Sequence, residues 1–221
     1  MTRGLFVTGT DTEVGKTLVA AALVHAYRRT GITAAGMKPI AAGCQAIDGK
    51  WRNEDVDAML DASSPGIVVD DINVHLYREP IAPHIAAARS GTQIDIPSIV
   101  ARHARLAGKV DAVVVEGAGG FLVPLNEHDT FADLAIALGL PVVLTVGMRL
   151  GCINHALLTQ ETVVARGLPF AGWVANRVTP QMDAYDENLA TLHALLRAPC
   201  LGVIPHQPGI DPRTVSLRLP A

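Results

Sequence analysis

The sequence predicts an α/β fold in which a mostly parallel, doubly wound sheet is flanked by helices. Short apolar runs alternate along the chain with longer segments of helical pattern. The apolar runs do not alternate polar with apolar residues, so helices should cover both faces of the sheet. No linker rich in Ser, Gly or Pro and no run of charge divides the chain, which predicts a single domain over residues 1–221.

The individual elements follow from local pattern. Six short apolar runs indicate buried strands at Leu5–Val7, Ala34–Met37, Ala112–Val115, Val142–Val146, Ala171–Val174 and Leu201–Ile204. Longer segments between them indicate helices at Lys16–Arg29, Asp55–Asp61, Ile96–Ala107, Thr130–Leu138, Ile153–Arg166 and Ala184–Leu196. Prolines interrupt the stretch from Ser63 to Ser90, where only Ile72–Leu76 could pair as a strand.

Composition excludes several classes of protein. Charged residues make up 18% of the chain and the net charge is −3, so the clustered Lys and Arg of a nucleic-acid-binding surface are not expected. Asp133, Gly139 and Pro141 break the most hydrophobic long stretch, which predicts no membrane segment. Three scattered cysteines form neither a disulfide framework nor a zinc spacing, and the first residues do not have the pattern expected of a signal peptide. These features favour small-molecule chemistry in the cytoplasm.

The strongest local signal is the segment Gly9–Thr17, GTDTEVGKT, between the first predicted strand and helix. A glycine-rich loop at this place holds phosphate on backbone N–H groups, while Lys16 reaches the terminal phosphates and Thr17 can bind Mg²⁺. Gly9 lies one residue earlier than the usual pattern requires, because Thr10 occupies that position. With a strand before it and a helix after it, the segment predicts a P-loop NTPase fold.

Two carboxylates and a second lysine follow other predicted elements. Glu116 ends an apolar strand before the turn Gly117–Gly120, where it could hold Mg²⁺ or remain a solvated strand-end residue. Asp55 could bind the same cation or only cap a helix. Lys38 ends the second strand and could clamp a transferring phosphoryl group, or lie along the surface with its ammonium in water.

The motifs together resemble the ATP-dependent dethiobiotin synthetases. Seven blocks match in order along nearly the whole chain: Gly9–Thr17, Lys38-Pro39, Asn53–Asp55, Glu79-Pro80 with Pro83-His84, Glu116–Gly120, Gly151–His155 and Gly172–Asn176. The resemblance implies that 7,8-diaminononanoate, CO₂ (from bicarbonate) and ATP give dethiobiotin, ADP and phosphate. It implies a carbamate, then a carbamic–phosphoric anhydride, and finally closure of the ureido ring.

The resemblance also implies roles for residues, and a homodimer with the substrate site at its interface. Lys38 and Lys16 would be catalytic, and Thr17, Asp55 and Glu116 would hold Mg²⁺. The nucleotide would contact Glu13, Val14, Gly15, Lys16, Thr17, Leu18, Asp55, Glu116, Gly117, Ala118, Gly119, Asn176, Arg177, Pro205, His206 and Gln207, with Asn176 reading adenine. The diamino acid would contact Thr12, Lys38, Ala42, Gly151, Cys152, Ile153 and Asn154.

Some features depart from this resemblance or leave alternatives open. Ala42 stands where many relatives carry a hydroxyl residue, so only its backbone could contact substrate. Cys152 is better explained as a small buried thiol than as a nucleophile, and Asn188 could reach the substrate carboxylate or only face solvent. The alternative function is a nucleotide-switch ATPase that acts through a protein partner. Asp11 argues against this alternative. P-loop ATPases that partition DNA or place division sites carry a lysine at the corresponding position of the loop, and this sequence does not. An amidating ligase of the cobyrinic acid type would need an attached glutaminase domain.

Overall fold

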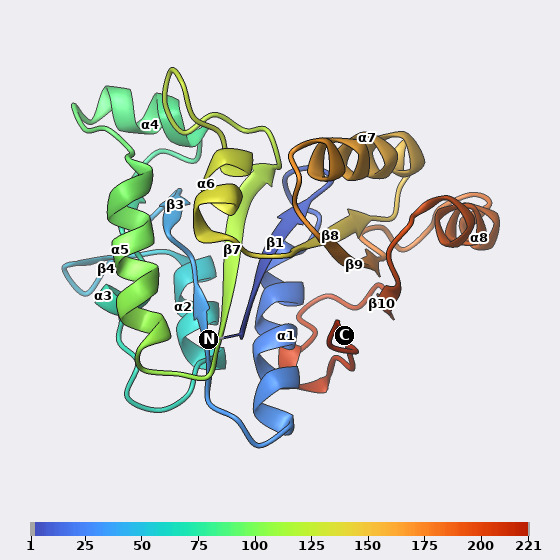
Figure 1. Ribbon diagram of the computed structural model, residues 1–221, viewed down its shortest axis with the longest axis horizontal. Coiled ribbons are helices and arrows are strands. Elements are labelled where there is room, and N and C mark those ends of the chain that lie inside the picture. The colour runs from blue at the N-terminus through green and yellow to red at the C-terminus, as the bar shows by residue number, and fades with distance from the viewer. Residues whose placement is uncertain (1–2, 221) are drawn as a thin grey trace.

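A computed structural model of the chain describes residues 3–220. Its centre is a six-stranded sheet of order β10-β9-β8-β1-β7-β2, and every neighbouring pair is parallel (Figure 1). The strands are β1 (Arg3–Gly9), β2 (Ala34–Met37), β7 (Ala112–Gly120), β8 (Val142–Gly147), β9 (Phe170–Asn176) and β10 (Cys200–Ile204). The predicted fold class is confirmed, and each of the six predicted strands is present.

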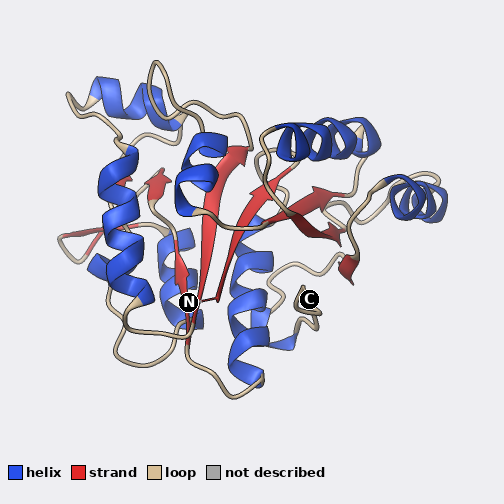
Figure 2. Cartoon of the chain, viewed as in Figure 1, coloured by secondary structure: helices blue, strands red, loops and turns tan. Residues whose placement is uncertain are grey.

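Helices lie along both faces of this sheet (Figure 2). They are α1 (Lys16–Arg29), α2 (Glu54–Ala62), α3 (Val69–Ile72), α4 (Pro83–Arg89), α5 (Ile96–Ala107), α6 (Phe131–Leu138), α7 (Cys152–Ala165) and α8 (Tyr185–Leu195), with a 3₁₀ turn η1 (Pro212–Thr214). The crossover from β1 to β2 runs across the sheet in the opposite direction to those from β7 to β8, β9 and β10. Right-handed crossovers therefore place α1 on one face and α6, α7 and α8 on the other.

The core explains how these elements pack so closely. In α1 the residues Ala20, Ala21 and Ala22 are fully buried, and their small side chains let the helix backbone approach the sheet. Phe6 of β1 and Val114 of β7 are also fully buried, as expected for strands covered on both faces. The three cysteines are free and buried. Among the described residues, none of the helices combines the length and apolar character that a membrane crossing requires.

The structure corrects the region between β2 and α5. Two short strands, β3 (Ile40–Ala42) and β6 (His75–Tyr77), pair in parallel outside the main sheet. Two others, β4 (Gln45–Ile47) and β5 (Lys50–Arg52), form an antiparallel hairpin. The expected strand Ile72–Leu76 is wrong at its start, because Ile72 ends α3 and the backbone joins the pair only at His75. There Asn73 donates Nδ2 to the carbonyls of Lys38 and His75, which turns the chain.

A second correction concerns Glu116. The sequence predicted that Glu116 ends its strand, but β7 continues to Gly120. The extension forms because β1 keeps pairing with it, with Gly9 opposite Gly120 after a register shift. Glu116 therefore lies inside the sheet, opposite Val7 of β1.

Candidate active site

The phosphate loop lies between β1 and α1, as the sequence predicted. Gly15 is the N-cap of α1 with φ 83°, and a Cβ there would lie 2.2 Å from Nδ2 of Asn176. Only glycine fits both the backbone conformation and this contact. Lys16 is buried, and its Nζ donates to the carbonyl oxygen of Asp11 at 2.8 Å. The free N–H groups of the first turn of α1 and the ammonium of Lys16 thus form a seat for anions.

Four side chains from separate elements meet beside this loop. The hydroxyl of Thr17 lies 2.6 Å from Oδ1 of Asp55 and 2.9 Å from Oε1 of Glu116. Nζ of Lys38 lies 2.6 Å from Oε1 of Glu116 and 2.9 Å from Oδ2 of Asp55. It also donates to the carbonyl of Gly117 at 3.3 Å. Lys38 is therefore a buried ion-pair partner, and the alternative of a surface lysine is wrong.

Asn53 explains how Asp55 reaches this position. Its Oδ1 accepts hydrogen bonds from the backbone N–H groups of Asp55 and Val56, so it caps α2. Its Nδ2 donates to the carbonyl of Ala42 at 3.1 Å. A single amide thus fixes the start of the helix against β3. Asp55 need not cap the helix, and its carboxylate turns to Thr17 and Lys38.

Burial and charge shift the pKa values of these groups in different directions. Burial lowers the pKa of Lys16 to about 8, and the nearby charge of Lys38 acts the same way. Burial opposes the charged form of Lys38, yet Glu116 and Asp55 raise its pKa above the ordinary value. Burial raises the pKa of Glu116, although Lys38 offsets part of this effect. For Asp55, burial acts to raise the pKa, but Lys38, Thr17 and Lys16 together outweigh it and the pKa is lowered.

The set formed by Thr17, Asp55 and Glu116 fits a divalent cation. A hydroxyl and two carboxylates supply the oxygen ligands that Mg²⁺ prefers. Oε2 of Glu116 is buried and has no hydrogen-bond partner among the described residues, so a coordination position on this carboxylate remains available. In residues 3–220 no group of three His, Cys, Asp or Glu that could hold a metal ion occurs.

A cavity of about 690 Å³ opens over these groups. Most of the predicted residues around the phosphate loop line it: Thr12, Glu13, Gly15, Lys16, Thr17, Lys38, Ala42, Asp55, Glu116, Ala118 and Gly119. Sequence reasoning assigned no role to the remaining lining residues, which are Ile40, Glu54, Pro80, Ile81, Ala82, Pro83 and Val123. The Glu79-Pro80 and Pro83-His84 blocks were the available signal for one wall. Val14 is fully buried, Leu18 packs against the core, and Gly117 contributes its carbonyl to Lys38.

The predicted adenine-side residues gather beyond the other side of the loop. Asn176 ends β9 and donates Nδ2 to the carbonyl of Val14 at 2.8 Å. The N–H of Arg177 donates to the carbonyl of Ile204, and a ring nitrogen of His206 lies 3.3 Å from the carbonyl of Arg177. The ends of β9 and β10 thus bring Asn176, Arg177 and the segment Pro205–Gln207 together.

The predicted carboxylate segment, Gly151–Asn154, does not line the cavity. It forms the N-terminus of α7, where Gly151 is the N-cap and no side chain caps the first turn. Cys152 is buried, as expected of a structural thiol. Asn188 donates its side-chain amide to the carbonyl of Ala184, within its own helix start.

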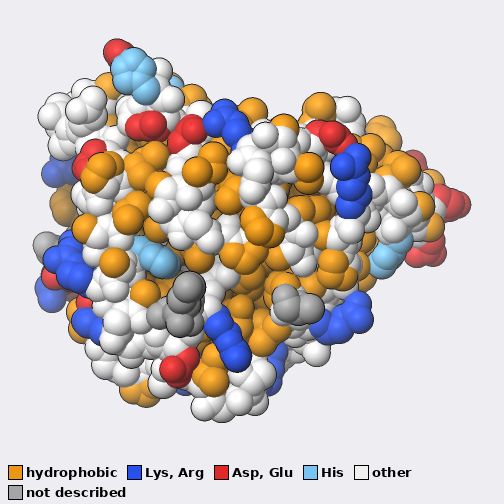
Figure 3. Space-filling view, viewed as in Figure 1, with side chains coloured by type: hydrophobic (Ala, Val, Ile, Leu, Met, Phe, Trp, Pro, Cys, Tyr) orange, Lys and Arg blue, Asp and Glu red, His pale blue; other side chains and the backbone are white. Residues whose placement is uncertain are grey.

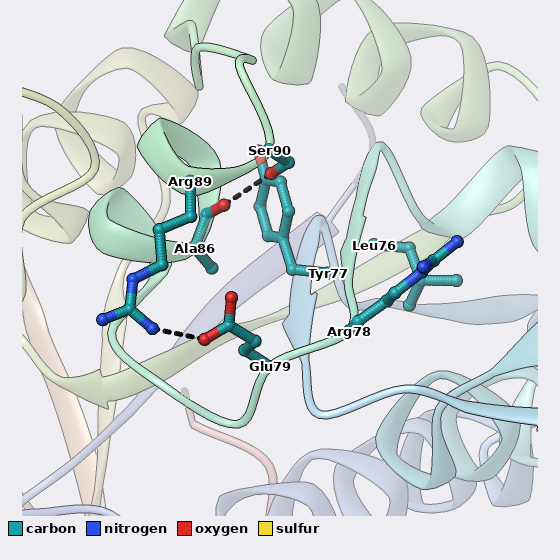
Figure 4. A pocket seen from close by; sticks show the side chains of 7 residues that line it. All are labelled: Leu76, Tyr77, Arg78, Glu79, Ala86, Arg89 and Ser90. Carbon is teal, nitrogen blue, oxygen red and sulfur yellow. Dashed lines mark hydrogen bonds and ion pairs between the residues drawn. The ribbon is translucent and has the colours of Figure 1, made fainter.

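A separate cavity of about 370 Å³ lies between β6 and α4 (Figure 4). It is lined by Leu76, Tyr77, Arg78, Glu79, Ala86, Arg89 and Ser90, and none of the predicted site residues reaches it. In Figure 4 the guanidinium of Arg89 and the carboxylate of Glu79 point toward one another and form an ion pair. This pair connects α4 to the loop after β6, which leads to Pro80 and the wall of the larger cavity.

The parallel sheet, the phosphate loop and the oxygen ligands define a nucleotide-binding enzyme of the P-loop NTPase fold. Comparison with known structures agrees on the fold. A ParA family ATPase from Chlorobium tepidum superposes with a TM-score of 0.57 at 11% identity, covering 93% of this chain and 84% of that one. Chloroplast FtsY from Physcomitrella patens gives a TM-score of 0.52 at 16% identity; 99% of this chain is covered, and the match spans 62% of the FtsY chain.

Sequence comparison is more specific. A family model described as an AAA domain matches residues 3–214. The ATP-dependent dethiobiotin synthetase BioD of Aromatoleum aromaticum is 54% identical over 220 residues, which cover 99% of this chain and 98% of that protein. The chain belongs to the ATP-dependent dethiobiotin synthetase family, a family of ligases. The resemblance found in the sequence motifs is confirmed.

Proposed function

We propose that this enzyme makes dethiobiotin in biotin biosynthesis from 7,8-diaminononanoate, CO₂ and ATP. One substrate amine adds to CO₂ and loses a proton, which gives a carbamate. A carbamate oxygen attacks the γ-phosphorus and ADP leaves. The second amine then attacks the carbonyl carbon of the carbamic–phosphoric anhydride, loses a proton and expels phosphate, closing the ureido ring.

The observation that carries this proposal is the convergence of Lys16 and Lys38 on one cavity beside two carboxylates. The reaction brings a carbamate oxygen against a negatively charged phosphate, so alignment and charge neutralisation are the main tasks of the protein. Lys16 binds the terminal phosphates. Lys38 faces the carbamate and the transferring phosphoryl group, and its raised pKa keeps it cationic.

Thr17, Asp55 and Glu116 are the residues that would hold Mg²⁺, which supplies charge neutralisation to the β- and γ-phosphate oxygens when bound. Asn176 presents an amide to the purine edge, and Arg177, Pro205, His206 and Gln207 surround it. The N–H groups of Gly15, Lys16 and Thr17 close on phosphate. Thr12 and the carbonyl of Ala42 face the reacting end of the diamine.

The substrate carboxylate binds at the N-terminus of α7, whose first-turn N–H groups have no side-chain cap. Because Gly151–Asn154 lies outside the cavity of its own chain, this seat serves a second copy of the chain in a homodimer. Exposed apolar side chains support such an interface: Leu122 of the loop after β7, Leu150 before α7 and Leu158 on α7. Figure 3 shows a broad apolar area on the face that carries α6, with charged side chains mostly toward the edges.

The three free cysteines are consistent with a location in the reducing cytoplasm.

Product analysis tests the function. ATP turnover should require the diamine and bicarbonate together and should yield dethiobiotin in equal amount to ADP. Turnover that ignores the diamine and rises with a protein partner would favour the nucleotide-switch alternative instead. For the dimer, a subunit lacking Lys16 is mixed with one lacking Asn154, and heterodimers with one intact composite site should regain activity. Exchange of subunits without any recovery would refute the shared site.

A further inference from the structure

The segment between β8 and α7 is held on the phosphate loop by several contacts. The N–H of Gly147 donates to the hydroxyl of Thr10 at 3.2 Å, and the N–H of Thr10 donates to the carbonyl of Thr145 at 3.0 Å. Gly147 also packs on Val14, whose Cγ1 would lie 2.6 Å from any Cβ added there. The β8 end and the phosphate loop therefore form one packed unit.

One ion pair extends this unit toward α7. The guanidinium of Arg149 pairs with Oδ2 of Asp11 in the phosphate loop. Oδ1 of Asp11 accepts from the N–H of Thr12, and its carbonyl oxygen accepts from Nζ of Lys16. Asp11 thus connects Arg149 to the lysine that faces the terminal phosphates.

The residues that follow Arg149 in the chain form the proposed carboxylate seat at the start of α7. Leu150, the next residue, is 92% exposed and does not pack on the core of its own chain. Gly151 then caps α7 with φ 94°, and the N–H of Cys152 donates to the carbonyl of Arg149. The backbone of Arg149 is therefore bonded directly to the first turn of α7, while its side chain pairs with Asp11 of the phosphate loop.

We propose that Arg149 is a positioning residue that couples the phosphate loop to the carboxylate seat at the start of α7. Nucleotide binding moves Lys16 from the carbonyl of Asp11 toward phosphate, and the Asp11–Arg149 pair transmits the change to Gly151. ATP and the diamine then strengthen one another's binding. This inference rests on the proposed function, and in the proposed homodimer the coupling passes from one subunit's nucleotide to the other subunit's substrate.

The expected size follows from exposure. The side chains of Arg149 and Asp11 are 44% and 46% exposed, so the pair resembles a surface ion pair, which changes an equilibrium by about two- to fivefold. Arg149→Gln should raise the KM for the diamine by this factor while kcat stays within about twofold. Arg149→Lys should recover part of the loss.

The test is a double-mutant cycle on the intact enzyme. Asp11→Asn removes the charge but keeps an oxygen for the N–H of Thr12. Arg197→Gln is the control, because the Arg197–Glu161 pair is also a surface ion pair, 65% and 63% exposed, and touches neither the phosphate loop nor the first turn of α7. ATP affinity is measured by calorimetry with and without the diamine for each variant. The two site variants should each remove the gain in ATP affinity that the diamine gives, and the double variant should lose no more than either one.

Three outcomes separate the possibilities. The inference stands if Arg149→Gln and Asp11→Asn are non-additive and the control matches the unmodified enzyme at equal melting temperature. It is overturned if Arg149→Gln keeps both the diamine KM and the ATP–diamine coupling, or if the two effects add. If the unmodified enzyme itself shows no diamine-dependent turnover, the proposed function fails instead.

Discussion

The buried ion pair between Lys38 and Glu116 gives the sharpest test of the site. Lys38 is 3% exposed, Glu116 is 1% exposed, and their charged atoms lie 2.6 Å apart. Lys38→Met keeps most of the side-chain volume and removes the ammonium. Among the described residues, the carboxylate of Glu116 then keeps only the hydroxyl of Thr17 as a donor. A buried charge that loses its partner destabilises a fold by about 3–5 kcal/mol, which is the loss expected for this variant at pH 7.

The variant of the other residue of the pair, Glu116→Gln, should lose less folding stability. In Glu116→Gln the lysine still pairs with Asp55, whose carboxylate is partly solvated, so about 1–3 kcal/mol should be lost. The double variant buries neither charge of the pair, and its loss should fall short of the sum of the single losses by about 2 kcal/mol. Lys38→Met should also abolish dethiobiotin formation while it retains ATP binding.

The loss of stability in Lys38→Met should depend on pH in a defined direction. Burial already raises the pKa of Glu116, and the loss of Lys38 raises it further. A carboxyl whose pKa is raised on folding stabilises the fold below its unfolded pKa, and this contribution is lost as pH rises through the folded pKa. The defect of Lys38→Met should therefore be largest near neutral pH and shrink as the pH falls toward 4. Asp55 contributes in the opposite sense in the unmodified protein, because its pKa is lowered.

Urea unfolding at pH 7 and pH 5, with and without Mg²⁺, measures all of these quantities. Mg²⁺ should stabilise Lys38→Met more than the unmodified protein, because no ammonium competes with it for Glu116. A loss below about 1 kcal/mol that is additive with Glu116→Gln would refute the buried pair as the basis of the site.

The remaining predictions concern the nucleotide and the diamine. The pKa of Lys16 is about 8, and a bound phosphate favours the charged form of this lysine, so ATP binding should take up about half a proton at pH 8 and almost none at pH 6. Calorimetry in buffers of different ionisation enthalpy measures this proton uptake, and equal uptake at both pH values would contradict the prediction. Thr17→Val should raise the Mg²⁺ concentration needed for half-maximal turnover by at least about tenfold, since it removes one of the three proposed oxygen ligands. An unchanged requirement would exclude Thr17 from the proposed metal site. Ala42→Ser adds a hydroxyl to the cavity wall, so the KM for the diamine should fall by about two- to tenfold with ATP affinity unchanged; a KM that stays constant would show that this position does not face the diamine.

The sequence predicted the main sheet well because its signals are local. The bounds of α1, β2 and α5 match the predicted ranges, and the loop Gly9–Thr17 lies where a strand-to-helix motif requires it. The pair formed by β3 and β6 could not be found in this way. Each strand has three residues, and their partners are separated by a hairpin and two helices, so no periodicity marks them. The wall Pro80–Pro83 follows from that pair and was missed with it.

Arg149 shows a different limit. An arginine followed by an exposed leucine resembles any surface loop, and its partner Asp11 lies far away in the chain. The contact exists only because β8 lies next to β1, which brings the two strand ends together. Lys38 was predicted as a site residue for its place at a strand end, whereas its burial between two carboxylates became evident only from the folded arrangement.

The position of Glu116 inside β7 explains why the pKa of Glu116 is raised whereas the pKa of Asp55, in the same site, is lowered. At the end of a strand Glu116 would meet solvent, as Asp55 does at the start of α2, and Lys38 would lower its pKa in the same way. Within the sheet Glu116 is almost completely buried, so burial, with the nearby charge of Asp55, outweighs the ion pair with Lys38 and raises its pKa. The continuation of β7 to Gly120 is therefore part of the chemistry, because it makes Glu116 depend on a cation for its charge. Lys38 supplies that cation in the structure, and the unpartnered Oε2 is the place where a divalent ion would add to it.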